Sequence, residues 1–325
     1  MPPAAKKTIG TCKTMCSSAE VQFRINNNLV HILECTEQNS NGKLMPEPQK
    51  MVKEFSRSAA GCDLMVAEHL RPTNVLEKTV DYLLSVYKER KKEKWDLVYN
   101  FVVDRLRAVR QDMVVQRLNA KDSLFLLEKM IPFYVEAEYL FKTKAAPFTD
   151  WKLHATQMED CFSNWNSCLS TEVSYSYDIL FMSFFRNSKN IEKMMFLLQF
   201  FPLELRRQAL QLHSAYTSGN YVRFFRLFSQ LKSTIVKQSL IDFVHDIRLH
   251  AIYTVAKAYK TPNAVLPSNV LQKWLMIDED SNFSCVLRDF FPLSSSSVCI
   301  NSFDINRQRE PFRDFYLYSI SLDLN

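Results

Sequence analysis

The chain has 325 residues, 47% of them hydrophobic, and a formal net charge of +6. This composition excludes a disordered chain and is sufficient for a buried core, while so small a positive charge permits a polyanionic partner without requiring one. Only 4 glycines occur, which disfavours the glycine-rich turns of β-sandwiches and the phosphate loops of nucleotide-binding folds. We therefore expect a mainly helical, globular protein.

The cysteines and the apolar segments indicate where the protein works. Eight cysteines are scattered along the chain, and no apolar segment follows the opening MPPAAKK to act as a secretion signal. No apolar stretch approaches the roughly 20 residues that a membrane helix needs. We expect a soluble protein in a reducing cytosolic or nuclear compartment, without membrane insertion.

Residues 1–70 predict an irregular N-terminal segment that packs on a helical body. Two short helices, over VQFRINNNLVHILE and QKMVKEFSRSAA, flank a predicted loop, NSNGKLMPEPQK. Cys12 and Cys16 raise the alternative of a zinc site, which needs four ligands, commonly as two close pairs. Cys35 and Cys62 do not form a second close pair, so we expect Cys12 and Cys16 to pack, with no metal and no cofactor.

Residues 71–244 predict a helical-repeat body. Apolar residues recur at three- and four-residue steps from Val75 to Tyr87, and KERKKEK at 88–94 is typical of a solvated helix end, with a nucleic-acid patch as the alternative. Short turns between the helices predict helix pairs stacked as an irregular, TPR-like solenoid, and Gly219 and Asn220 break the chain before one of them. Further helices are expected over 95–118, 123–143, 149–168, 171–187, 190–201, 203–217, 220–232 and 237–260.

One segment of this body, VYNFVVDRLRAVRQDMVVQRL at 98–118, combines a continuous apolar stripe with charged residues. At 100° per residue Arg110 and Asp112 fall on the two borders of the stripe, and Arg105 leans toward it. Asp104 and Arg107 fall on the outer side, within reach of each other. The pattern predicts a salt-bridged core helix, with a direct partner contact as the alternative.

Residues 245–325 predict a winged-helix module with a small β element. Two short helices follow TPNAVLPSN, the first capped by Ser268, and alternating apolar residues then predict strands near 298–305 and 316–322. Such a module can contact nucleic acid, although ordinary solvated charges are the simpler interpretation and an acidic run at 278–280 lies nearby. The candidate phosphate contacts are Lys273, Arg288, Arg307 and Arg309.

The common catalytic motifs are missing from the sequence. It has no glycine-rich phosphate loop, no Gly-x-Ser-x-Gly elbow and no His-Glu-x-x-His. None of the six histidines has a helix-spaced histidine partner. We therefore expect a protein that binds other molecules rather than an enzyme, with no catalytic residues.

Five segments resemble, in the same order, the motifs of the suppressor-of-actin/GANP homology family. They are GTCKTMCSSAE, VKEFSRSAAG, LRPTNVLEKTVDYLL, DRLRAVRQDMVVQ and GNYVRFFRLF. The chain departs from the family pattern at Ser17 and Thr73, where proline is usual. The resemblance implies a PCI-like architecture, in which a helical-repeat stack ends in a winged helix.

The resemblance also implies a non-enzymatic scaffold, for which two roles remain open. The chain looks most like the short, single-domain form of the family, which implies centrosomal or spindle partners, a location at the centrosome and spindle, and a role in centrosome duplication and spindle progression. The alternative is a subunit of a nuclear mRNA export complex at the nuclear pore. That role implies a PCI-domain partner, a small acidic subunit and contact with nucleic acid through the winged helix.

Overall fold

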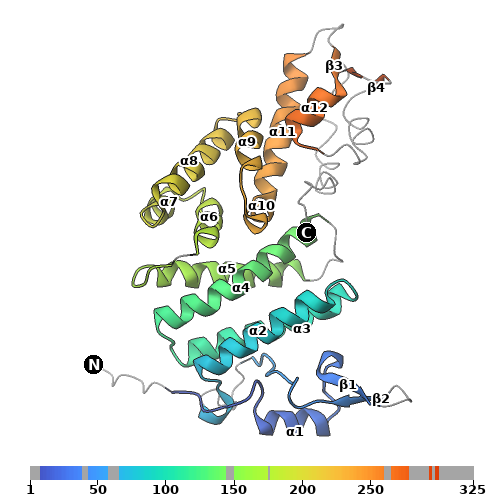
Figure 1. The fold of residues 1–325 in the computed structure, drawn as a ribbon, viewed down its shortest axis with the longest axis vertical. Coiled ribbons are helices and arrows are strands. Elements are labelled where there is room, and N and C mark those ends of the chain that lie inside the picture. Colours follow the sequence, from blue (N-terminus) through green and yellow to red (C-terminus); the bar gives the residue numbers. More distant parts are fainter. Residues whose placement is uncertain are drawn as a thin grey trace. The chain divides into compact units, whose positions relative to one another are not determined.

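The fold is mainly helical, as the sequence predicts (Figure 1). A computed structural model describes residues 8–38, 43–57, 66–143, 150–174, 176–259, 265–277, 293–294 and 297–299. The chain divides into two compact units. Unit 1 comprises Met1–Tyr134 and Pro147–Val173, and unit 2 comprises Val135–Ala146 and Ser174–Asn325. None of the helices that the structure describes combines the length and the apolar composition needed to cross a bilayer.

Unit 1 contains a small N-terminal subdomain and a group of long helices. The Ser17 side chain caps the first helix by accepting a hydrogen bond from the Glu20 backbone N–H, and Asp150 caps α5 in the same way through Leu153. Helices α2 and α3 lie side by side (Figure 1). The elements are α1 (Ser18–Asn26), η1 (Ile32–Glu34), β1 (Cys35–Gln38), β2 (Lys43–Pro46), η2 (Ala67–His69), α2 (Thr73–Arg90), α3 (Trp95–Val115), the first part of α4 (Ala120–Lys142) and α5 (Trp151–Cys168).

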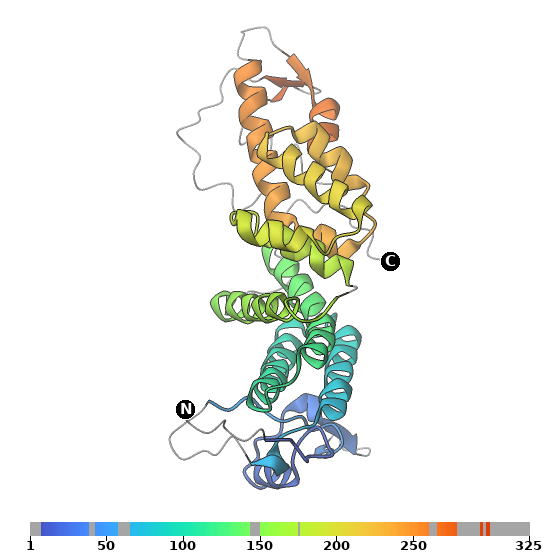
Figure 2. The ribbon, with the colours of Figure 1, turned by 90° about the vertical axis from the view of Figure 1, so that its left-hand side faces the viewer.

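Unit 2 contains shorter helices and a small antiparallel sheet of strand order β3-β5-β4. Helix α9 contacts α8, α11 and α12, and Figure 2 shows these helices from a second side. The elements are the end of α4, α6 (Tyr177–Arg186), α7 (Ile191–Leu198), α8 (Leu203–Thr217), α9 (Tyr221–Ser229), α10 (Thr234–Ser239), α11 (Ile241–Ala258), β3 (Val265–Pro267), α12 (Ser268–Leu275), β4 (Leu293–Ser294) and β5 (Ser297–Cys299).

The predicted helix over QKMVKEFSRSAA is wrong for its described part, because residues 51–57 form no helix. Their backbone N–H groups bond to distant partners instead: Val52 to Glu34 Oε1 at 3.0 Å and Glu54 to Glu20 Oε1 at 2.9 Å. A helix would withdraw these donors from carboxylates that need them. The predicted loop at 39–50 is also partly wrong, since residues 43–46 form β2, which pairs antiparallel with β1.

Two predicted helix boundaries in unit 2 also differ from the structure. The single helix expected over 237–260 is divided at Leu240, whose φ of −93° and ψ of 10° lie outside the helical region, so that α10 and α11 are separate helices. The helix expected from residue 171 begins at Tyr177. Leu240 is fully buried, and this packing sets the break where the local sequence shows no breaker.

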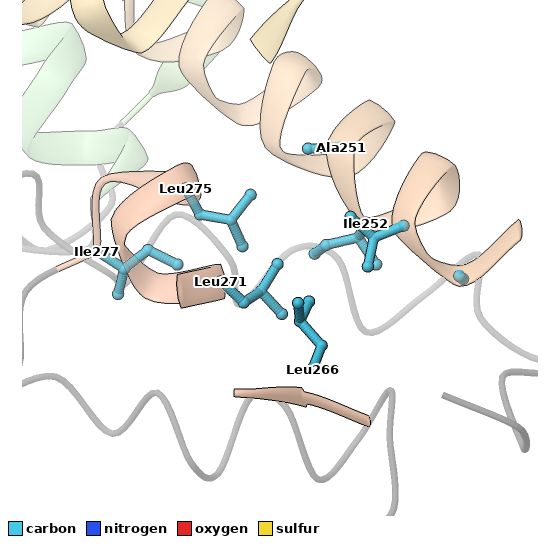
Figure 3. Packing of buried hydrophobic residues seen from close by; sticks show 8 residues of the cluster. Ala251, Ile252, Leu266, Leu271, Leu275 and Ile277 are labelled. Atoms are coloured by element: carbon cyan, nitrogen blue, oxygen red, sulfur yellow. The ribbon is translucent and has the colours of Figure 1, made fainter. Parts of the chain in front are cut away.

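The C-terminal part of unit 2 has an apolar core of its own. Ala251 and Ile252 of α11 face Leu271 and Leu275 of α12, with Leu266 of β3 beside them (Figure 3). Arg248 holds the end of α12, because its Nε donates to the Leu275 carbonyl at 2.9 Å and its Nη2 to the Met276 carbonyl at 2.6 Å. The second of the two short helices predicted after TPNAVLPSN and the predicted strand near 316–322 lie outside the described residues.

Candidate interaction site

Residues 10–12, at the start of the segment GTCKTMCSSAE, lie on the end of α3 and on η2. The Gly10 N–H donates to Gln116 Oε1 at 2.8 Å, Thr11 N–H to the Ala67 carbonyl at 2.8 Å and Cys12 N–H to the Leu70 carbonyl at 3.0 Å. A Cβ atom at residue 10 would lie 2.3 Å from the Leu70 carbonyl oxygen, a distance at which the segment would have to move away. Glycine is therefore required for this close backbone approach.

Cys12 and Cys16 are both buried. The Cys12 thiol donates to the Thr14 carbonyl at 3.2 Å, and burial raises the pKa of the Cys16 thiol well above its usual value. Both cysteines therefore pack in the interior of unit 1. Within the described ranges, no group of three or more His, Cys, Asp or Glu residues is arranged to hold a metal ion.

Asp112 is the centre of a buried ionic cluster in unit 1. Its side chain is fully buried and binds the Lys53 ammonium group through Oδ1 and the Arg71 Nε through Oδ2, each at 2.7 Å. The Gln116 side chain closes the arrangement by donating to the Arg71 carbonyl at 2.8 Å. Three of the segments that resemble family motifs therefore meet at one carboxylate. Asp112 was predicted at the border of the apolar stripe, and the structure shows that it is more deeply buried than this position implies.

A second cluster joins α1, η1 and α3. Glu34, fully buried, pairs with Arg24 and lies 3.5 Å from Arg105 Nη2, which also bonds Glu54 Oε1 at 2.7 Å. Arg24 donates in addition to the Val52 carbonyl at 3.0 Å. Buried positive and negative side chains of the N-terminal segment and of α3 thus contact one another. Such an arrangement is stable only when every charge is paired.

Asp104 and Arg107 do not form the expected pair with each other. Asp104 instead pairs with Arg105 and accepts a hydrogen bond from the Phe55 backbone N–H at 3.3 Å. The Arg107 guanidinium group lies 3.7 Å from the centre of the Phe55 ring. Residues 53–55 therefore contact charged side chains of α3 that were expected to pair with each other within the helix.

Arg110 lies on the other side of α3, against α5. It donates to the Gln157 side chain, and its Nη1 lies 3.7 Å from Asp160 Oδ2. Burial raises the pKa of the neighbouring Cys161 thiol to about 11, so this cysteine is a protonated core residue at neutral pH. Of the α3 residues chosen from sequence, Arg105 and Asp104 join the Glu34 cluster, Asp112 forms its own, and Arg110 lies apart from both.

In unit 2, Gly219 and Asn220 form the turn between α8 and α9. Gly219 has a φ of +67°, and the Asn220 side chain caps α9 by accepting from the Arg223 N–H at 3.0 Å. Lys273 lies on α12 and lines a cavity of about 680 Å³ together with Arg226, Trp274 and Asn269. Arg288, Arg307 and Arg309 lie outside the described residues, so this part of the candidate nucleic-acid surface stays a prediction.

Sequence reasoning missed the partners of the charged α3 residues. Glu34, Lys53 and Arg71 lie 41 to 71 residues before the α3 residues that they contact, and of these three only Lys53 and Arg71 fall within segments that resemble family motifs. Arg226 was missed as a neighbour of Lys273 for the same reason. The local signal that was present is a pair of charged residues between apolar ones, as Lys53 and Glu54 are between Val52 and Phe55.

Comparison with known proteins places these features in a family. The SAC3/GANP family model matches residues 15–290. SAC3 family protein B of Arabidopsis thaliana is 29% identical over 144 residues, 44% of this chain and 8% of that protein. Protein xmas of Drosophila melanogaster is 24% identical over 280 residues, 78% of this chain and 13% of its own length.

A THP3 homolog of Schizosaccharomyces pombe is 26% identical over 226 residues, 68% of this chain and 51% of its own length. The chain thus spans about half of this relative and a far smaller share of the other two. The family model, in contrast, covers most of the chain and contains the charged residues of α3 that bind the N-terminal segment. The chain therefore belongs to the SAC3/GANP family.

Proposed function

We propose that this protein is a non-enzymatic interaction scaffold and a subunit of a nuclear mRNA export complex, which contacts a PCI-domain partner and nucleic acid through its C-terminal part. Membership of the SAC3/GANP family supports a scaffold that works within a protein complex. The role at the centrosome and spindle stays a prediction, because the names of the matched relatives refer to neither structure.

The proposed architecture is a PCI-like solenoid that ends in a winged helix over 245–325. Consecutive helices in contact, namely α2 with α3, α6 with α7 and α8 with α9, support the solenoid. The apolar core shared by α11, β3 and α12, together with the antiparallel β3-β5-β4 sheet, supports the winged helix (Figure 3). The boundaries at residues 70 and 244 belong to the same proposal.

The observation that carries the nucleic-acid contact is the cavity between α9 and α12. Lys273 and Arg226, both exposed, line it beside Trp274. No described carboxylate forms an ion pair with either cation, which supports a role for both in binding phosphates. A cation pair next to an aromatic ring is the combination that holds a nucleic-acid backbone and stacks a base.

Fluorescence anisotropy with a labelled single-stranded RNA 20-mer and with a DNA duplex tests this contact in the full chain. We expect salt-dependent binding, and the double variant Lys273→Glu/Arg226→Glu should weaken it and reduce the slope of log K against log salt by about 1 per lost phosphate contact. The matched control is Lys189→Glu/Lys193→Glu beside and on α7, which makes the same change in charge. No binding at low salt, or equal losses in both double variants, would refute the contact.

Affinity purification from dividing cells separates the two roles that the family resemblance leaves open. Recovery of a PCI-domain protein together with a small acidic subunit supports the export complex. Recovery of centrosomal or spindle proteins alone would contradict it and favour the mitotic role. In a second arm of the anisotropy experiment, the variant Arg288→Glu/Arg307→Glu shows whether these two predicted contacts take part in RNA binding.

A further inference from the structure

Arg110 differs from the other buried arginines of unit 1 in its counter-charge. Arg71 and Arg105 each contact a carboxylate at 2.7 Å, and Arg24 pairs directly with Glu34. Among the described residues, the one carboxylate paired with Arg110 is that of Asp160, at 3.7 Å, and the Asp160 side chain is 55% exposed. The Nε–H of Arg110 is buried and has no hydrogen-bond partner among the described residues, as is also true of one donor each on Arg24, Arg71 and Arg105. Arg110 is thus held by a neutral hydrogen bond to Gln157 and by one half-exposed carboxylate, so its charge can still pair with an anion from another molecule.

The surface next to Arg110 is hollowed. Arg110 and Arg117 line the same cavity of about 220 Å³, at the junction of the end of α3, the start of α4 and the end of α5. Arg117 is exposed and forms no ion pair with any residue in the described part of the chain. Asn164, Ser123 and Ser167 add polar groups to the same lining. The cavity therefore presents two cations and three neutral hydrogen-bonding side chains.

The remaining wall of the cavity is apolar. Met113, Val114, Leu118 and Leu127 line it, and Val114 is 68% exposed although it belongs to the last turn of α3. An exposed apolar side chain beside two arginines favours a ligand with an anionic group and a hydrocarbon part close together. A nucleic-acid backbone, with a charge on every nucleotide and polar sugars between, matches this wall less well.

We propose that the α3–α4–α5 cavity binds an acidic segment of a protein partner, with an aspartate or glutamate carboxylate on Arg110 and Arg117 and an adjacent apolar side chain on Val114 and Leu118. The planar guanidinium fork accepts a carboxylate through two parallel hydrogen bonds. This site lies in unit 1, so its failure and the failure of the nucleic-acid contact in unit 2 are separate results.

A peptide array with the full chain as the labelled probe tests the site. The peptides carry a central Asp or Glu flanked by each apolar residue in turn, and matched arrays carry Asn or Gln, or phosphoserine, at the centre. We expect selective binding to acidic peptides with an apolar neighbour. The strongest binder is then measured by anisotropy, where Arg117→Gln should weaken binding about tenfold, the effect of one charge-assisted hydrogen bond.

Val114→Glu should abolish the same binding, because it places a negative charge at the cavity rim without changing the core. The controls are Arg90→Gln at the end of α2 and Ile191→Glu on α7, which make the same chemical changes at exposed positions elsewhere. Equal affinity of acidic and amide peptides, a preference for phosphoserine, or binding that Arg117→Gln and Val114→Glu leave unchanged would each overturn the proposal.

Discussion

Asp112 shows how much of this fold depends on single buried charges. One carboxylate holds Lys53 and Arg71, which lie 59 and 41 residues away in the chain, and through them fixes the N-terminal segment on α3. Glu34 does the same for Arg24 and the Val52 backbone. These ion pairs add little stability compared with apolar side chains in the same place. Removing either carboxylate is nevertheless costly, because it leaves a buried positive charge unpaired.

We predict that Asp112→Ala destabilises unit 1 by about 3–5 kcal/mol, because it removes the one described carboxylate that pairs with Lys53 and Arg71. Urea unfolding followed by tryptophan fluorescence measures this in a Trp274→Phe background, where the remaining tryptophans, 95, 151 and 165, all lie in unit 1. The control is Asp81→Ala, which removes an exposed pair with Lys129 and should cost less than about 1 kcal/mol. Equal effects would contradict the role of Asp112.

At the scale of the elements, the turns and caps decide where helices end. Asn190 and Asn220 cap α7 and α9, and each side chain accepts a hydrogen bond from the backbone N–H three residues on. Gly219 ends α8 in the left-handed region, and the His250 ring packs directly over it, so that a Cβ atom would lie 2.2 Å from His250 Nε2. The α8–α9 turn thus requires glycine at residue 219 for two reasons, its left-handed backbone conformation and the contact with His250 of α11.

We predict that Gly219→Ala destabilises unit 2 by about 1–2 kcal/mol, the cost of a left-handed conformation for a residue with a Cβ atom. Gly219→Asn should cost less, because asparagine tolerates this region better than alanine. Thermal unfolding of the two variants measures the difference. Repeating both in a His250→Ala background removes the ring contact, and a cost that then disappears would show that crowding, not backbone strain, is responsible.

At the scale of the whole molecule, each unit has its own buried aromatic core. Phe162 and Trp165 lie in that of unit 1, and Phe184 and Phe224 in that of unit 2. Histidines lie at the edges of these cores: His31 stacks on Phe101 at 4.8 Å between ring centres, and His213 lies 5.8 Å from Phe184. Burial lowers the pKa of His31, His213 and His245, so the folded protein prefers all three neutral.

These three histidines predict that stability falls as the pH falls through and below about 6.5, the usual pKa of histidine. Below that pH the unfolded chain binds protons that the folded chain does not, and the free energy of unfolding therefore decreases. Melting temperatures at pH 7.5, 6.5 and 5.5 measure the effect, and His213→Gln should reduce its size. A melting temperature that rises on acidification would contradict the prediction.

The amino-acid sequence by itself determined the helical class, the approximate position of most helices and the order of the family motifs. Leu203–Thr217 and the start of α9 follow from apolar periodicity and from Gly219 and Asn220, because helix periodicity and caps are local properties. The positions of Arg105 and Asp112 beside the apolar stripe of α3 predicted that both would be at least partly buried.

Only the tertiary structure decided which residues these charges contact. Residues 51–57 have a helix-compatible sequence, yet backbone donors of this segment go to Glu34, Glu20 and Asp104, and the segment forms no helix. The break at Leu240 and the cavity beside Arg110 likewise arise from packing between elements distant in the chain. Local propensity cannot encode these choices, because a buried charge takes its partner from whichever segment the fold brings within reach.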